Sequence, residues 1–214
     1  KQTDFTNDEI LFSAISPGGY SLVKDENFIP ARTAVSIIEK GGLGYFTLNE
    51  LEKKLAGVNL EVTPWISELY EGIRGKTTAD DLETCFKLIY LYFTSPRKDQ
   101  DAFLAYREEW KTEIENRSSS PETVFWDTVW WILSREHFRR RPYSLDMLAE
   151  MDLDTSYSFY KDRFKDAGDF TFFFVGDFSL PTIESLINTY LANLPSSGRV
   201  ETWRDSGIDP PDGV

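Results

Sequence analysis

The residue types that hold a hydrolytic metal are scarce in this sequence. Histidine occurs once, at His137, and cysteine once, at Cys85. A catalytic zinc site takes about three protein ligands, and helical zinc motifs place two histidines three or four residues apart. We therefore predict no metal-binding residue in this segment and interpret His137 as a lone structural or surface residue. A calcium or magnesium site made of carboxylates alone remains an alternative hypothesis, although the sequence has no EF-hand loop.

The motifs of nucleophilic catalysis are also missing. There is no Gly-x-Ser-x-Gly elbow, so a nucleophile would have to be Cys85 assisted by His137. Cys85 lies on the apolar stripe of a predicted helix, which indicates a core position. Residues 17–20 follow a predicted strand but lack the further glycines and the lysine of a phosphate-binding loop. We predict no catalytic residue here and assign no substrate-binding residue.

A basic cluster stands out in an otherwise acidic chain. Four arginines fall within seven residues, namely Arg135, Arg139, Arg140 and Arg141. Guanidinium groups bind carboxylates through two parallel hydrogen bonds. The cluster therefore predicts either a site for carboxylates or a partner's acidic face, or internal pairing with nearby acidic residues.

A tryptophan-rich helix is predicted over residues 125–133. Its apolar side chains cover most of its circumference, so it belongs to the core or to an inter-domain contact. In the second case Trp126, Trp130 and Trp131 form an apolar patch that is left exposed where a neighbouring domain docks.

Composition limits the class of protein. The chain has 214 residues, of which 41% are hydrophobic and 15% aromatic, and this favours one folded domain with its own core. Lys and Arg number 23 against 36 Asp and Glu, which gives a net charge of −13 and argues against nucleic acid and anionic membranes as partners. A single cysteine excludes an internal disulfide, and no apolar run approaches the roughly 20 residues that span a bilayer.

Hydrophobic periodicity predicts an α+β domain with an antiparallel sheet and helices packed on one of its faces. A capping box at Thr47 and Glu50 starts one helix, and Pro64 is expected to end a strand. We predict one domain over residues 1–198 and a linker over 199–214 that leads to a following domain of a longer protein. The predicted strands are 9–16, 58–62, 67–74 and 170–176, and the predicted helices are 30–40, 48–56, 78–93, 99–116, 125–133, 157–164 and 180–191.

Several segments, taken in order, carry a family resemblance. The chain resembles one non-catalytic domain of the insulinase/pitrilysin family of zinc metallopeptidases, with particular similarity to large bacterial members. The resemblance covers nearly the whole chain and rests on residues 10–19, 41–44, 50–57, 81–83, 90–97, 169–178 and 190–195.

The resemblance implies the fold of a mitochondrial-processing-peptidase-like metallohydrolase domain. Family members have four such α+β domains, arranged as two halves that enclose a chamber. Zinc sits in the first domain on a His-x-x-Glu-His motif and a distal glutamate, and the motif glutamate is the general base. This chain has no such motif and looks like the third domain, which begins the inactive half. The family's substrate-contacting arginine and tyrosine lie further along, so no site residue is carried over.

The resulting expectation is a scaffold domain that helps to form the chamber wall of a peptide-hydrolysing zinc metalloendopeptidase. The segment alone is predicted to be inactive, without a cofactor, while zinc is expected in the catalytic domain of the parent protein. Its partners would be the other domains of the same polypeptide and the parent's peptide substrate, and the resemblance favours a periplasmic or secreted location. The alternative is a non-enzymatic binding or assembly module, such as an inactive paralogue. A third hypothesis is an unrelated hydrolase that uses carboxylates.

Overall fold

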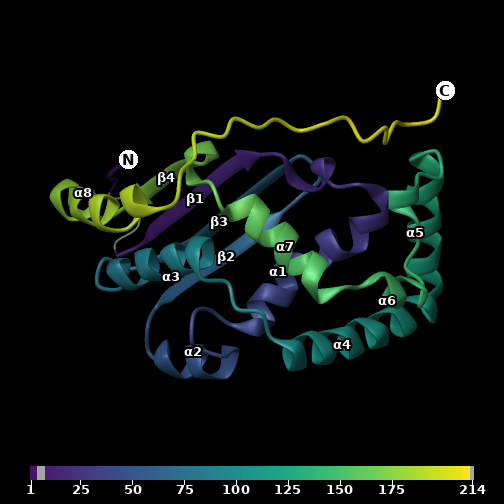
Figure 1. Cartoon of the computed structure of the whole chain (residues 1–214), viewed down its shortest axis with the longest axis horizontal. Coiled ribbons are helices and arrows are strands. Elements are labelled where there is room, and N and C mark those ends of the chain that lie inside the picture. The colour runs from purple at the N-terminus through teal and green to yellow at the C-terminus, as the bar shows by residue number, and fades with distance from the viewer. Residues whose placement is uncertain (4–7, 213–214) are drawn as a thin grey trace.

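The computed structural model describes residues 1–3 and 8–212. Within this part of the chain, four strands form one antiparallel sheet in the order β2-β3-β1-β4 (Figure 1). The predicted α+β class with an antiparallel sheet is therefore confirmed. The strands are β1 (Ile10–Pro17), β2 (Leu60–Ile66), β3 (Tyr70–Thr77) and β4 (Thr171–Gly176).

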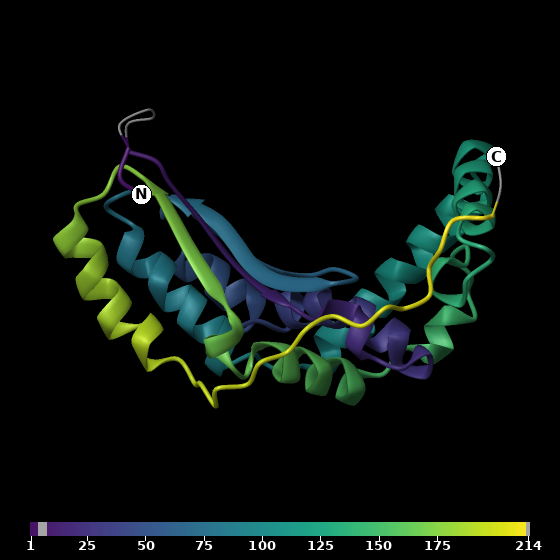
Figure 2. The same cartoon turned by 90° about the horizontal axis from the view of Figure 1, so that it is seen from above.

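Helices gather on one side of this sheet, as Figure 2 shows. α1 packs against β2 and α7, and α3 packs against β2 and β3. α4 lies along α1 and continues into α5 at the end of the molecule away from β4 (Figure 1). The helices are α1 (Phe28–Gly41), α2 (Leu48–Lys54), α3 (Leu82–Thr94), α4 (Gln100–Ser118), α5 (Pro121–Leu133), α6 (Met147–Glu150), α7 (Leu153–Phe164) and α8 (Leu180–Thr189).

Alternation along β1 decides which face of the sheet is covered. Ile10, Phe12 and Ala14 are buried against the helices, whereas Leu11 on the opposite face is half exposed. Side chains of a strand point alternately to its two faces, so every second residue of β1 enters the core. β1 lies between β3 and β4 and is therefore an interior strand of the sheet.

Two hydrophobic clusters share α1. The larger one lies between the sheet and α1, α3, α7 and α8, where the ring of Phe86 stacks on Phe174 with centroids 5.1 Å apart. The smaller one joins α1 to α4 and α6 through Ile37, Trp110 and Met147. Because α1 belongs to both clusters, it fixes the position of α4 relative to the sheet.

Of the two local signals predicted from the sequence, the capping box is confirmed and the strand end at Pro64 is not. The capping box is present, since Thr47 accepts from the Glu50 backbone N–H and the Glu50 carboxylate accepts from that of Thr47. Gly42 follows α1 with a φ of 88°, a conformation that favours glycine. The prediction that Pro64 ends a strand is wrong, because Pro64 lies inside β2 and pairs with Ile73. β2 is an edge strand, where the missing N–H of proline breaks no ladder.

An extended segment, residues 199–212, runs along the molecule from the end near α8 to α5 (Figures 1 and 2), and we call it the strap. It is attached mainly by polar contacts. Arg199 pairs with Asp169 at 2.9 Å, and the Arg204 N–H donates to Ser21 Oγ. Near its end Asp212 pairs with Arg135 at 2.5 Å. Residues 213 and 214 of the predicted 199–214 linker lie outside the described residues.

Candidate functional site

The four clustered arginines have different environments. Arg139, in the short 3-10 turn Phe138–Arg140, is buried, and its guanidinium donates to Asp25 at 2.8 Å and to the carbonyl oxygens of Tyr20 and Val23. It joins the loop before α1 to the segment after α5. A guanidinium with its donors satisfied in this way is a structural element.

Two other members of the cluster also pair internally. Arg141 donates to both carboxylate oxygens of Glu150 at 2.7 Å, and Arg135 pairs with Asp212 of the strap. Arg140 differs, because it is exposed and its side chain has no hydrogen bond or ion pair within the described residues. Three of the four arginines therefore pair with acidic residues of the same chain, and Arg140 is the exception among the described residues.

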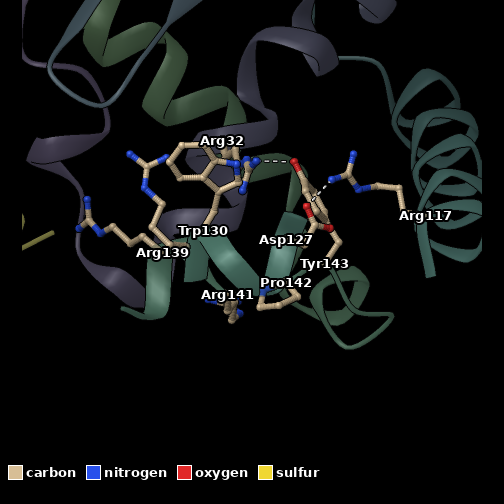
Figure 3. Close-up of a pocket in the computed structure, with 9 residues that line it drawn as sticks. Arg32, Arg117, Asp127, Trp130, Arg139, Arg141, Pro142 and Tyr143 are labelled. Carbon is tan, nitrogen blue, oxygen red and sulfur yellow. Dashed lines mark hydrogen bonds and ion pairs between the residues drawn. The ribbon is translucent and has the colours of Figure 1, made fainter. Parts of the chain in front are cut away.

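The same segment forms one wall of an arginine-rich pocket of about 270 Å³ (Figure 3). α1 contributes Arg32, α4 contributes Arg117, and α5 contributes Asp127 and Trp130. The pocket lining thus holds five arginines against one aspartate, which suits an anionic group. The remaining lining residues are Arg139, Arg140, Arg141, Pro142 and Tyr143.

Tyr143 organises the charged side chains of this pocket. The guanidinium carbons of Arg32 and Arg117 each lie 4.7 Å from the centre of its ring, and Arg32 also donates a hydrogen bond to its hydroxyl (Figure 3). Arg117 pairs with Asp127 at 2.7 Å, while its Nε is buried without a hydrogen-bond partner among the described residues. The ring stabilises both cations through cation–π attraction, yet only one carboxylate in the lining balances them.

Sequence reasoning found Arg139, Arg140 and Arg141 but missed Arg32 and Arg117. These two residues come from helices far from the cluster in sequence, and packing of α1 against α4 brings them together. No local motif marks them. The contact of Trp110 with Tyr143, whose ring centroids are 5.9 Å apart, is one of the contacts that hold the segment after α5 against these helices.

The two candidate reactive residues make structural contacts. Cys85 is fully buried in α3, and burial raises the pKa of its thiol to about 12, so it stays protonated at neutral pH. His137 accepts a hydrogen bond at Nδ1 from the Arg139 backbone N–H and thereby caps the 3-10 turn. Across residues 1–3 and 8–212, no three His, Cys, Asp or Glu side chains are grouped so as to hold a metal ion.

A buried carboxylate lies at the start of β3. Glu71 is fully buried and accepts a 2.5 Å hydrogen bond from the Gly19 N–H. Arg163 of α7 is 3.8 Å away and pairs more closely with Glu201 of the strap, at 2.8 Å. Burial raises the pKa of Glu71 to about 7, and the Gly19 hydrogen bond and Arg163 offset only part of this effect.

The tryptophan-rich helix α5 is largely uncovered. Trp126 is 50% exposed and Trp130 62%, and Phe125, Ile132 and Leu133 are also exposed. None of the residues of α5 is buried, although Trp131, which was predicted to belong to the same patch, is only partly exposed and has a buried indole N–H. The core interpretation of this helix is therefore wrong, because its apolar pattern says nothing about which element covers it, and α5 projects beyond the sheet. We call the five exposed side chains of Phe125, Trp126, Trp130, Ile132 and Leu133 the α5 apolar face.

Comparison with known proteins gives a consistent result, although no protein-family model matches the chain. It is 24% identical to a probable zinc protease PqqL of Haemophilus influenzae, over 98% of this chain and 22% of that protein. It is 26% identical to a PQQL-like zinc protease of Arabidopsis thaliana, over 91% of this chain and 18% of that protein. The chain thus spans about a fifth of the length of these relatives.

Solved structures share the fold. The periplasmic protease PqqL of Escherichia coli superposes with a TM-score of 0.80 at 14% identity, over 98% of this chain and 23% of that one. A peptidase M16 inactive domain of Pseudomonas fluorescens superposes with a TM-score of 0.73 at 14% identity, over 95% and 50%. The resemblance to the insulinase/pitrilysin family is confirmed. The homologues are PqqL-like zinc proteases, and the fold is that of a peptidase M16 domain.

The described helices do not include one with the length and apolarity that a membrane crossing would require.

The ferredoxin protease FusC, which was solved in complex with Arabidopsis ferredoxin, is another structural neighbour, with a TM-score of 0.75 at 13% identity over 94% of this chain and 22% of that one. Members of this structural group therefore include a protease that binds a whole protein.

Proposed function

We propose that this chain is a non-catalytic, chamber-forming domain of an insulinase-like zinc metallopeptidase, in the position of the third domain. Residues 1–198 would be the domain and residues 199–214 the connection to a following domain. Zinc and the general base would reside in a separate catalytic domain of the parent protein. By analogy with the E. coli relative, which is periplasmic, the parent would work in the periplasm.

The observation that carries this proposal is the α5 apolar face. A folded monomer rarely exposes this many large apolar side chains on one helix, and such a patch is typical of an interaction surface. Because the relatives are about five times longer than this chain, the occupant with the strongest support is another part of the same polypeptide. A rigid domain that docks through α5 would fix the position of the catalytic half relative to the opposite wall of the chamber.

A first test is to read the gene around this segment and assay the chain itself. The open reading frame is expected to encode a His-x-x-Glu-His motif upstream of these residues. The 214-residue chain should take up no stoichiometric zinc at micromolar concentration in a calorimetric titration, and it should leave a quenched fluorescent peptide intact. A reading frame without the motif would favour a non-enzymatic assembly module, and one tightly bound zinc in this chain would refute the proposal.

A second test addresses docking in the full-length protein. Replacing both Phe125 and Trp126 by serine removes the part of the α5 apolar face that does not line the arginine-rich pocket, and it should lower peptide hydrolysis at least about tenfold, while zinc content stays unchanged. Tyr45→Ser is the matched control, because Tyr45 is 96% exposed and lies in the turn between α1 and α2. Equal activity of the double variant and the control would show that α5 does not dock.

A further inference from the structure

Two arginines of the arginine-rich pocket carry charge that the described residues leave unbalanced. Among the residues that the structure describes, Arg32 donates to the Tyr143 hydroxyl and makes no ion pair, and Arg140 is exposed without a side-chain partner. The other three lining arginines each pair with a carboxylate, namely Asp127, Asp25 or Glu150. The surplus of positive charge is therefore local to Arg32 and Arg140.

Four of the five lining arginines are held in place by contacts within the chain before any ligand arrives, and Arg140 is the exception. Arg32 and Arg117 are both fixed on the Tyr143 ring, so like charges are kept near each other by the fold. Arg117 also has a buried Nε donor without a partner in residues 1–3 and 8–212. One more negative group in the pocket would relieve this repulsion, and Arg32, one of the two arginines that would bind it, is already ordered, which lowers the entropy cost of binding.

We propose that this pocket binds a carboxylate group presented by a peptide. Arg32 and Arg140 would supply the charge-assisted hydrogen bonds, and Trp130 would contact the apolar part of the ligand. That the carboxylate belongs to a peptide rests on the proposed function, whereas binding of the carboxylate itself rests on the pocket alone. The volume of about 270 Å³ suits one side chain or one chain terminus and is small for a larger ligand.

Carboxylate is favoured over phosphate by the walls of the pocket. The rings of Trp130 and Tyr143, together with Pro142, provide an apolar lining beside the guanidinium groups. A glutamate side chain has a hydrocarbon stem that packs on such a surface, but inorganic phosphate has none. The pocket therefore offers an additional contact only to the organic anion.

The test uses the 214-residue chain and small probes, observed through chemical shifts of the arginine side chains and the Trp130 indole in NMR titrations. N-acetyl-glutamate amide presents a side-chain carboxylate, and N-acetyl-alanine presents a terminal one. Saturable binding of at least one of them, with shifts at Arg32 and Trp130, supports the proposal, and the tighter probe identifies the source of the carboxylate. N-acetyl-glutamine amide is the neutral counterpart and should bind at least about tenfold more weakly.

Variants separate the pocket from general charge effects. Arg140→Gln removes an exposed arginine without a partner, so the fold should persist while affinity falls at least about tenfold; Arg32→Gln should act in the same direction. Arg74→Gln removes an exposed arginine from β3, away from the pocket, and should leave affinity within about twofold. Equal binding of the glutamate and glutamine probes, tighter binding of phosphate, or equal losses in Arg74→Gln and Arg140→Gln would overturn the proposal. Because docking of α5 is not required, these results are independent of the proposed chamber role.

Discussion

Replacing Glu71 by glutamine is expected to remove a large part of the pH dependence of stability above pH 4.5. In the folded protein, burial raises the pKa of Glu71 from its ordinary 4.5 to about 7. Between these two values the folded chain keeps a proton that the unfolded chain has released. The free energy of unfolding therefore falls as pH rises through this window, and the loss is complete above about pH 7.

The magnitude follows from the two pKa values. A difference of one pKa unit corresponds to about 1.4 kcal/mol, so the contribution of Glu71 amounts to about 3 kcal/mol across the window. Glutamine is close in shape to the protonated side chain and retains an oxygen that can accept from the Gly19 N–H. At about pH 5, wild type and Glu71→Gln should agree within about 1 kcal/mol, and at about pH 8 the variant should be more stable by about 3 kcal/mol.

Urea unfolding followed by tryptophan fluorescence at several pH values from 5 to 8 measures this difference directly. Glu61→Gln is the matched control, since Glu61 is an exposed glutamate on the neighbouring strand β2, and its profile should follow that of wild type. The reasoning is refuted if wild type gains stability relative to Glu71→Gln as pH rises. That result would mean that attraction to Arg163 outweighs the cost of burying the ionised carboxylate.

Three further variants test the structural assignments by urea unfolding. Arg139→Gln should cost about 3 kcal/mol, because it removes a buried guanidinium that donates to Asp25 and to two backbone carbonyl oxygens, whereas Arg140→Gln in the next position should cost less than about 0.5 kcal/mol. Similar costs would contradict the distinction drawn within the arginine cluster. Phe86→Ala should cost about 4 kcal/mol, since the ring is fully buried against Phe174. Trp130→Ser in the isolated chain should change stability by less than about 0.5 kcal/mol, and a larger loss would show that α5 belongs to the core.

Much of the fold could be predicted from local pattern. The alternation in β1, the capping box at Thr47 and the glycine after α1 each have a cause within a few residues, so the sequence displays them directly. Pro64 was misinterpreted because the penalty for proline in a strand depends on whether the strand has a second neighbour. That information comes from the order of strands in the sheet and is not local.

The candidate site was predictable only in part. The run of arginines from Arg135 to Arg141 indicated a carboxylate partner, but it could not tell which member would be left unpaired. Asp25, which pairs with Arg139, lies 114 residues away in the sequence, and Glu150, which pairs with Arg141, lies nine residues away in α6. The exposure of Trp130 could not be predicted from the sequence either. An apolar helix has the same periodicity whether the element that covers it lies in this domain or in another.

The strap has a consequence for how the molecule responds to ionic strength. Its two ends are attached differently, because Arg163 and Arg199, which pair with Glu201 and Asp169, are largely buried, whereas Arg135 and Asp212 near α5 are exposed. Dissolved ions screen attractions between exposed charges beyond about 8 Å at physiological concentration and act much less on buried pairs. Concentrated salt should therefore release the end of the strap beside α5 first, while Glu201, whose negative charge helps to raise the pKa of Glu71, stays in place.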